Sequence, residues 1–92
     1  MPIVYIPTQL RSLTNDMEHL TVGGRTLRQV IDQLDQRFPG MKTRLCDEKG
    51  IRPGVAVTIG DEVATMGLIH PVEEDDEIHF LPAIGGGQSS KE

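Results

Sequence analysis

The sequence predicts an α+β fold in which one main helix packs on one face of a mixed sheet of four or five strands. One long stretch, residues 26–38, has helical periodicity, and the segments on both sides of it are short and rich in β-branched residues. A chain of 92 residues is long enough for one small domain only. With 37% hydrophobic but only 3% aromatic residues, its core is expected to be aliphatic.

Two strands are predicted before the helix. Residues 2–7 are β-branched and aromatic and are bounded by prolines, which indicates a strand. A polar link follows, with turn residues at 14–16. Apolar and polar side chains alternate over residues 17–22, which predicts the second strand, and glycines at 23 and 24 end it. The close spacing favours an antiparallel pair.

The helix has the clearest pattern in the chain. Thr26 is the expected N-cap, and Gln29 three residues later completes a capping box. Pro39-Gly40 ends the helix. Its apolar side chains lie on one face, which is the pattern of a helix that packs on a sheet: Leu27, Val30, Ile31, Leu34 and Phe38.

Further strands are predicted after the helix. Residues 41–47 suit a short helix, and alternation over 55–59 predicts a strand that turns at Gly60-Asp61 into a short partner at 62–64. Residues 65–77 read as a loop, and a last strand, residues 78–81, ends at Pro82. The last strand is expected in the middle of the sheet, beside the first, because both carry apolar side chains that need burial: Val4, Ile6, Ile78 and Phe80.

Composition excludes several classes of partner. The net charge of −5 and the pI of about 5.1 argue against nucleic acid and against anionic membranes. No stretch has the pattern of a signal peptide or the length of a membrane span. Cys46 is the only cysteine, so no internal disulfide is possible. We therefore expect a cytoplasmic protein.

No resident catalytic site is predicted, and neither a metal nor a bound cofactor. His19, His70 and His79 are scattered, without the spacing of a metal site. Cys46 lies in no nucleophile motif and is expected to be an unreactive small thiol. The acidic run 73–77 lacks the spaced ligands of a calcium loop, so it reads as a solvated turn.

The C-terminal glycines suggest a different kind of function. Gly85, Gly86 and Gly87 have no side-chain bulk, so a narrow channel in a partner can close around their backbone. The stretch from Pro82 to Gly87 reaches at most about 20 Å, enough to present a carboxylate away from the domain. An inert chain end remains the alternative.

The order of elements and the C-terminal motif together resemble a known family. The motif runs from Asp76 to Gly87, with the sequence DEIHFLPAIGGG, and the resemblance extends over residues 2–87. It is similar to the ubiquitin-like β-grasp sulfur carriers of the MoaD/ThiS family. Residues 6–11 and the length of segment 39–54 are most similar to the type that feeds cysteine synthesis. The resemblance implies a β-grasp domain over 1–84 and a flexible tail over 85–92.

The resemblance also implies a chemistry for the tail. An E1-like adenylyltransferase that uses ATP would adenylate Gly87, which would become a thiocarboxylate while Gly85 and Gly86 occupy the partner's channel. Family members usually end at the second glycine, whereas here residues 88–92 follow. We therefore expect a proform, cut between Gly87 and Gln88 by a JAMM-type zinc metalloprotease.

The recipient of the sulfur stays open at this point. A cysteine synthase, the large subunit of molybdopterin synthase or a thiamin-type pathway would each fit the resemblance. Two other functions also remain: a protein modifier joined to lysines through Gly87, and an interaction domain with an inert tail. For docking of a partner, the exposed side of the last strand is expected to carry His79 and Leu81, with Tyr5 beside them.

Overall fold

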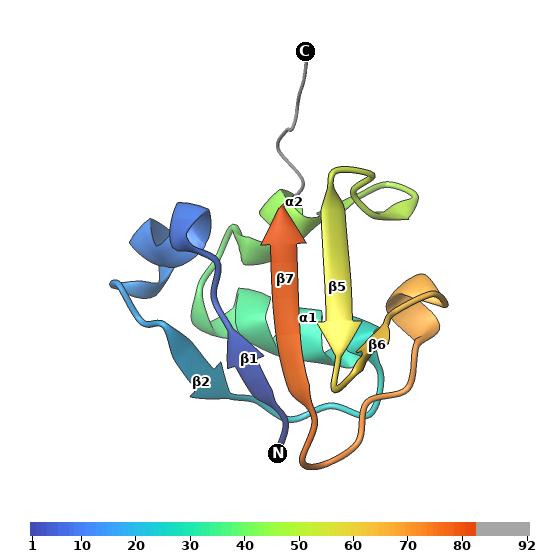
Figure 1. The fold of residues 1–92 in the computed structure, drawn as a ribbon. Helices are drawn as coiled ribbons and strands as arrows, with labels where there is room; N and C mark the ends of the chain where they lie inside the picture. The colour runs from blue at the N-terminus through green and yellow to red at the C-terminus, as the bar shows by residue number, and fades with distance from the viewer. Residues whose placement is uncertain (83–92) are drawn as a thin grey trace.

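The computed structural model describes residues 1–82, and residues 83–92 lie outside the described part. The predicted domain boundary at residue 84 and the predictions for Gly85, Gly86, Gly87 and Gln88 therefore fall on residues about which the structure gives no information. The predicted β-grasp fold is confirmed for the described residues, with a five-stranded mixed sheet and one main helix across it (Figure 1).

The central strand of the sheet is the last one. The strand order is β2-β1-β7-β5-β6, and β7 pairs parallel with β1 and antiparallel with β5. The prediction that the last strand lies beside the first is confirmed. The strands span β1 Ile3–Tyr5, β2 His19–Thr21, β5 Val55–Ile59, β6 Glu62–Val63 and β7 Glu77–Pro82.

Helix α1, Leu27–Arg37, covers one face of this sheet. The Thr26 hydroxyl accepts a hydrogen bond from the Gln29 N–H at 3.3 Å, as expected of an N-cap. The Gln29 side chain, however, accepts from the N–H of Arg25 at 2.8 Å, one residue before the cap. Both bonds satisfy backbone donors near the start of the helix. Of the helices within residues 1–82, none combines the length and the apolar character needed to cross a membrane.

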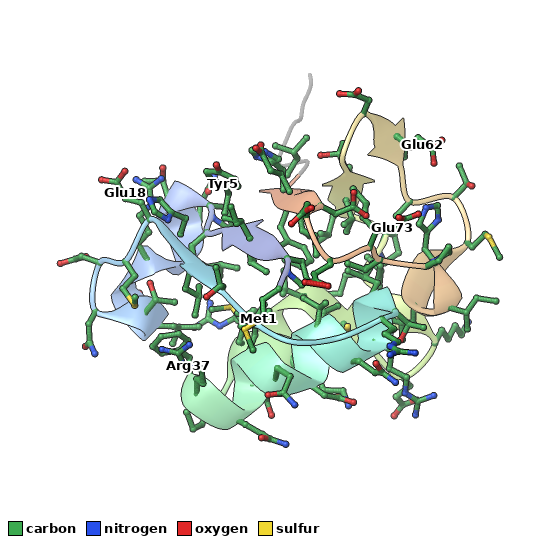
Figure 2. All side chains as sticks on the ribbon, turned by 90° about the horizontal axis from the view of Figure 1, so that it is seen from below. Met1, Tyr5, Glu18, Arg37, Glu62 and Glu73 are labelled. Carbon is green, nitrogen blue, oxygen red and sulfur yellow. The ribbon has the colours of Figure 1, made fainter. Side chains whose placement is uncertain are left out.

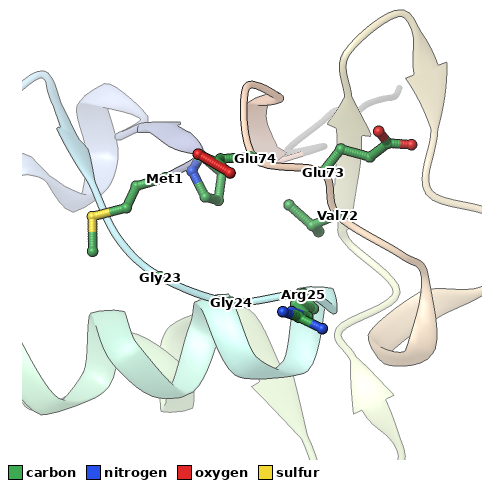
Figure 3. Close-up of a pocket in the computed structure, with 8 residues that line it drawn as sticks. Met1, Gly23, Gly24, Arg25, Val72, Glu73 and Glu74 are labelled. Carbon is green, nitrogen blue, oxygen red and sulfur yellow. The ribbon is translucent and has the colours of Figure 1, made fainter.

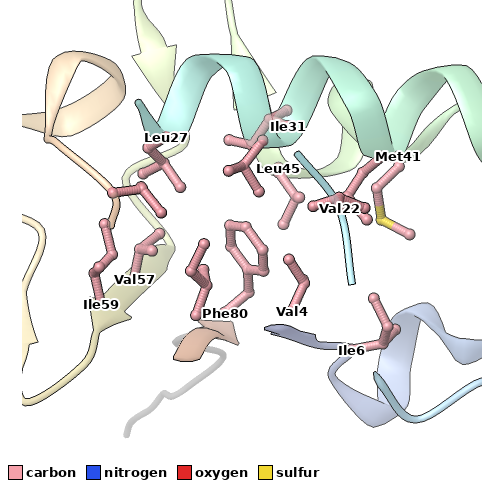
Figure 4. Close-up of a cluster of buried hydrophobic side chains, with 14 of the residues drawn as sticks. Val4, Ile6, Val22, Leu27, Ile31, Met41, Leu45, Val57, Ile59 and Phe80 are labelled. Carbon is pink, nitrogen blue, oxygen red and sulfur yellow. The ribbon is translucent and has the colours of Figure 1, made fainter. Parts of the chain in front are cut away.

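The core lies between α1 and the sheet. Leu27 and Ile31 point from the helix towards Phe80, Val4 and Val57 on the strands (Figure 4). All five side chains are at most 3% exposed. The predicted aliphatic character of the core is confirmed for the described residues, among which Phe80 is the one buried phenylalanine and Tyr5 is not buried. Burial of this kind contributes about 25 cal/mol for each Å² of apolar surface.

The polar link predicted between the first two strands contains a helical segment. A 3-10 helix, η1 Thr8–Thr14, occupies the expected polar link between the first two strands. The second strand is shorter than the predicted residues 17–22. Thr14 is fully buried there, with its hydroxyl 3.2 Å from the Arg11 carbonyl oxygen and 3.1 Å from that of Met17. Its polar group is tolerated because these backbone oxygens accept its hydrogen bond.

The segment after α1 also differs from expectation. The predicted short helix ends at Leu45, as α2 Met41–Leu45, and is followed by a two-stranded ribbon of β3 Cys46–Asp47 and β4 Gly50–Ile51. The predicted loop 65–77 contains the 3-10 helix η2, Gly67–Ile69. It is also held against the start of α1, since the Leu27 N–H donates to the His70 carbonyl oxygen at 3.0 Å.

Gly24 should be one of the least replaceable glycines in the fold. Its φ is +146°, and an added Cβ would lie 2.9 Å from both Cγ2 and the backbone nitrogen of Val30. We expect Gly24→Ala to lower the free energy of unfolding by about 2–4 kcal/mol, through backbone strain and overpacking. Urea denaturation measures this. The matched control is Gly40→Ala, where φ is +102° but nothing lies within 4 Å. Equal losses in the two variants would contradict the steric argument.

Candidate functional site

The candidate site is the carboxyl end of β7 together with the sheet face opposite α1. Ile78 and Phe80 are buried, 0% and 3% exposed, and they anchor β7 in the core. His79 and Leu81 alternate with them and face outward, as the sequence predicts. β7 is paired with β1 over Glu77–His79 and with β5 up to Pro82, so its carboxyl end is held in the sheet through β5.

Tyr5 and His79 meet on this face. They are paired in the β1–β7 register, and their rings stack with centroids 4.3 Å apart and planes 3° apart. His19, the register partner of Tyr5 on β2, lies on the other side of Tyr5 with a centroid distance of 5.7 Å. Figure 2 shows Tyr5 on the side of the sheet away from the helix that ends at Arg37. The face therefore carries a row of three rings across three strands.

Leu81 lies apart from that row. It is 51% exposed and pairs in register with Ala56 of β5, two residues further along β7 than His79. Of the three predicted docking residues, the structure thus places Tyr5 and His79 in contact and Leu81 on the same face, nearer the end of the strand. His19 was not among the predicted docking residues, because its position beside Tyr5 depends on the strand register.

A candidate cavity for a small ligand lies elsewhere. A shallow hollow of about 440 Å³ is lined by Met1, Gly23, Gly24, Arg25, Glu73 and Glu74, among others (Figure 3). It opens at the start of β1, and because β1 and β7 are parallel this is the opposite end of the sheet from the end of β7. Among the described residues no salt bridge joins Arg25 to these glutamates. Nothing in the hollow suggests acid–base chemistry.

Within residues 1–82, no group of three or more His, Cys, Asp or Glu side chains could hold a metal ion. His70 is nearly buried, and its Nδ1 accepts from the N–H of Met66 at 3.4 Å while Nε2 lies 4.0 Å from a Glu62 carboxylate oxygen. This arrangement holds the segment around η2 in place.

Cys46 is a core thiol. It is 7% exposed, and burial raises the pKa of its thiol, with the nearby Lys42 ammonium opposing the shift. Since the thiolate is the nucleophilic form, Cys46 is poorly suited to react at neutral pH.

This burial predicts a pH dependence of stability. A thiol pKa that is higher in the folded than in the unfolded state means that the folded state holds the proton more tightly. That contribution is fully present below the unfolded pKa, about 8.5, and is lost as the pH rises through the higher folded value. We expect the difference in free energy of unfolding between the wild type and Cys46→Ala to shrink between about pH 8 and pH 10. Urea titrations of both proteins at each pH measure it; a constant difference would contradict the shift.

With the geometry established, comparison with known proteins identifies the class. The ThiS family model matches residues 4–87, and the chain belongs to this family. It is therefore a sulfur carrier of the β-grasp type and not an enzyme.

The individual relatives are carriers of one kind. The chain is 33% identical over 91 residues to the sulfur carrier protein CysO of Mycobacterium tuberculosis strain H37Rv, covering 91% of this chain and 96% of that protein. The same identity and coverage hold for CysO of Mycobacterium bovis.

Solved structures agree. A chain in the crystal structure of the Amycolatopsis orientalis BexX/CysO complex superposes with a TM-score of 0.89 at 32% identity, covering 95% of this chain and all of that one. The crystal structure of Mycobacterium tuberculosis CysO, an antigen, superposes with a TM-score of 0.83 at 29% identity. The match covers 91% of this chain and 100% of that one. The small archaeal modifier protein 1 of Methanosarcina acetivorans superposes with a TM-score of 0.78 at 23% identity, covering 94% of this chain and 95% of that one. At this identity the likeness shows the shared fold alone.

Proposed function

We propose that this carrier transports sulfur as a thiocarboxylate on Gly87, after removal of residues 88–92. The observation that carries the proposal is the end of the family match at residue 87, the last of three glycines, which leaves five residues beyond it. A JAMM-type metalloprotease would hydrolyse the Gly87–Gln88 peptide bond and leave Gly87 with a free carboxylate.

The activation then follows ordinary acyl chemistry. The Gly87 carboxylate attacks the α-phosphate of ATP in an E1-like adenylyltransferase, forming an acyl adenylate and releasing pyrophosphate. A sulfide-level nucleophile displaces AMP from the acyl carbon and leaves the thiocarboxylate. ATP is consumed by the partner, and the carrier itself binds no cofactor. Gly85 and Gly86 suit this role because bare backbone fits a channel that excludes side chains.

The described domain supplies a fixed base for this reaction. β7 is anchored through Ile78 and Phe80, so a partner that docks on the domain finds the chain leaving the sheet at one place. We propose that the partner docks on the face that carries Tyr5, His79 and Leu81, since stacked rings and a half-exposed leucine offer apolar contact beside the end of β7. The sulfur would pass to a biosynthetic enzyme of the cysteine synthase type, with molybdopterin- and thiamin-type pathways as the other candidates.

Mass spectrometry of the protein from its native host tests the proposal. We expect a chain that ends at Gly87, a fraction of which is heavier by the difference between a sulfur and an oxygen atom. Finding only chains that end at Glu92, even under sulfur limitation, would refute it. Higher-mass adducts that survive reduction and require Gly87 would instead assign the protein as a modifier joined to other proteins.

A further inference from the structure

Two arginines flank the end of β7 from which the chain continues. Arg52 lies just before β5, whose first residue, Val55, pairs with Pro82. Arg11 lies in η1, and its Nε donates to the carbonyl oxygen of Ile6, the residue that follows β1. β1 and β5 are the two neighbours of β7, one parallel and one antiparallel to it. The end of β1 and the start of β5 therefore lie at the same end of the sheet as the end of β7 (Figure 1).

Both guanidinium groups are held through Nε. The Nε of Arg11 donates at 3.1 Å, and the Nε of Arg52 donates at 3.0 Å to the carbonyl oxygen of Thr43. Among the described residues, the terminal Nη groups of both arginines make no hydrogen bond and no salt bridge. A guanidinium oriented in this way presents a planar fork of N–H donors, and that fork matches the two oxygens of a carboxylate.

The opposite end of the sheet is acidic. Ile59 at the end of β5 pairs with Ile78 near the start of β7, so the segments after β5 and before β7 lie together there. Half of the 14 acidic residues of the chain occupy positions 61–62 and 73–77 in these segments. No lysine or arginine follows Arg52 until after Pro82. Charge is therefore polarised along β7, with the arginines at the end where the tail begins.

The surface beside Arg52 is mainly apolar. A hollow of about 290 Å³ is lined by Pro53, Val55 and Val63, among others, and Arg52 is the one charged residue of this lining within the described part of the chain. Val63 is 60% exposed. Arginine next to apolar contact area is typical of protein interfaces. A carboxylate bound there would be partly shielded from water, which strengthens its interaction with the guanidinium.

We propose that Arg11 and Arg52 bind carboxylates of the activating enzyme at the entrance of the channel that takes up the tail; this rests on the proposed function. The location argues for that occupant. Gly85 follows Pro82 by three residues, so an enzyme that encloses the glycines has its channel entrance within about 10 Å of the strand end. An acidic entrance would attract this end of the domain and repel the other. The carrier would then approach with its tail first.

Steady-state adenylation of the chain that ends at Gly87 tests the two arginines. We expect Arg11→Gln and Arg52→Gln each to raise the KM for the carrier about 3-fold, and the double variant about 10-fold. The kcat should not change, because the arginines contact the enzyme and not the reacting carboxylate. The matched control is Arg25→Gln, which removes the same charge beside the start of β1, at the opposite end of the sheet. Arg25→Gln should leave KM unchanged, and an equal effect would overturn the proposal.

The wild-type carrier allows a second measurement that needs no variant. Its KM should rise about fivefold between roughly 50 and 300 mM NaCl, because salt screens exposed charge pairs. The KM of the double variant should rise less over the same range. A wild-type KM that does not depend on salt would overturn the proposal even if the variants failed to fold.

Other occupants of this surface would give different results. If the double variant raised the KM for ATP and left the KM for the carrier unchanged, the arginines would bind nucleotide phosphates. Sedimentation could instead show that the wild type associates with itself and the double variant does not. With an unchanged KM for the carrier, that result would assign the arginines to the acidic end of a second copy. Either outcome would overturn the proposal.

The two proposals fail differently. If the enzyme adenylates the wild type but its KM responds neither to the substitutions nor to salt, the arginine proposal is overturned while the proposed function stands. If the wild type that ends at Gly87 is never adenylated, both are overturned.

Discussion

A chain that ends at Gly87 is expected to be adenylated, whereas the chain that ends at Glu92 should react at least about 100-fold more slowly. In the longer chain the Gly87 carbonyl is part of an amide, so the carboxylate that would attack ATP is missing. The terminal carboxylate of Glu92 can replace it only if five residues with side chains enter a channel shaped for glycine. Each side chain forced into a packed site costs about 1–3 kcal/mol, and each 1.4 kcal/mol in the activation free energy is a factor of ten in rate.

ATP–pyrophosphate exchange with the activating enzyme measures this difference. A chain that ends at Gly86 is the matched control, because it has a free glycine carboxylate that is one residue too short. We expect it to react, but more slowly than the chain that ends at Gly87. Equal exchange by the 92-residue chain would show that no maturation is required and would remove the role proposed for the protease.

The overall architecture could be predicted because its determinants are local. The spacing from Leu27 to Leu34 is the signature of a one-sided helix, and those side chains are buried as expected. The central place of β7 also followed from the sequence, since Ile78 and Phe80 need burial on the same face as Val4.

The unpredicted elements depend on individual hydrogen bonds of single residues. The sequence pattern places Thr14 in a turn, yet its side chain is buried. Burial is tolerated because the hydroxyl lies within hydrogen-bond distance of the Arg11 and Met17 carbonyl oxygens. The sequence pattern places His70 in a loop. In the structure its carbonyl oxygen accepts a hydrogen bond from the N–H of Leu27, the first residue of α1, and its ring nitrogen accepts one from the N–H of Met66. Neither contact has a periodic pattern in the sequence, so neither could be found by pattern alone.

The candidate site also could be predicted only in part from the sequence. The alternation along β7 correctly predicted that His79 and Leu81 face outward. The contact of Tyr5 with His79, and the presence of His19 beside them, follow from the pairing of β1 with β7 and β2. Register of this kind is set by the whole sheet and not by one strand's own residues.

Replacing Gly86 by valine is expected to reduce adenylation of the chain that ends at Gly87 by about 10- to 100-fold. A β-branched side chain at this position adds bulk where the partner's channel is proposed to close around backbone, at a cost of about 1–3 kcal/mol. It also restricts the backbone, which glycine leaves unrestricted. Gly86→Ala should give an intermediate reduction, because a single methyl group adds less volume.

The stability of the domain separates this effect from misfolding. Gly86 lies beyond β7, and the buried side chains Ile78 and Phe80 that anchor that strand are unchanged in the variant. We therefore expect the same urea midpoint for Gly86→Val and the wild type. Gly24→Ala, in contrast, is expected to lower the free energy of unfolding. Normal adenylation of Gly86→Val would refute the channel argument, since nothing else in the proposal requires glycine at that position. A graded loss from glycine to alanine to valine, at constant stability, is the outcome that the channel predicts.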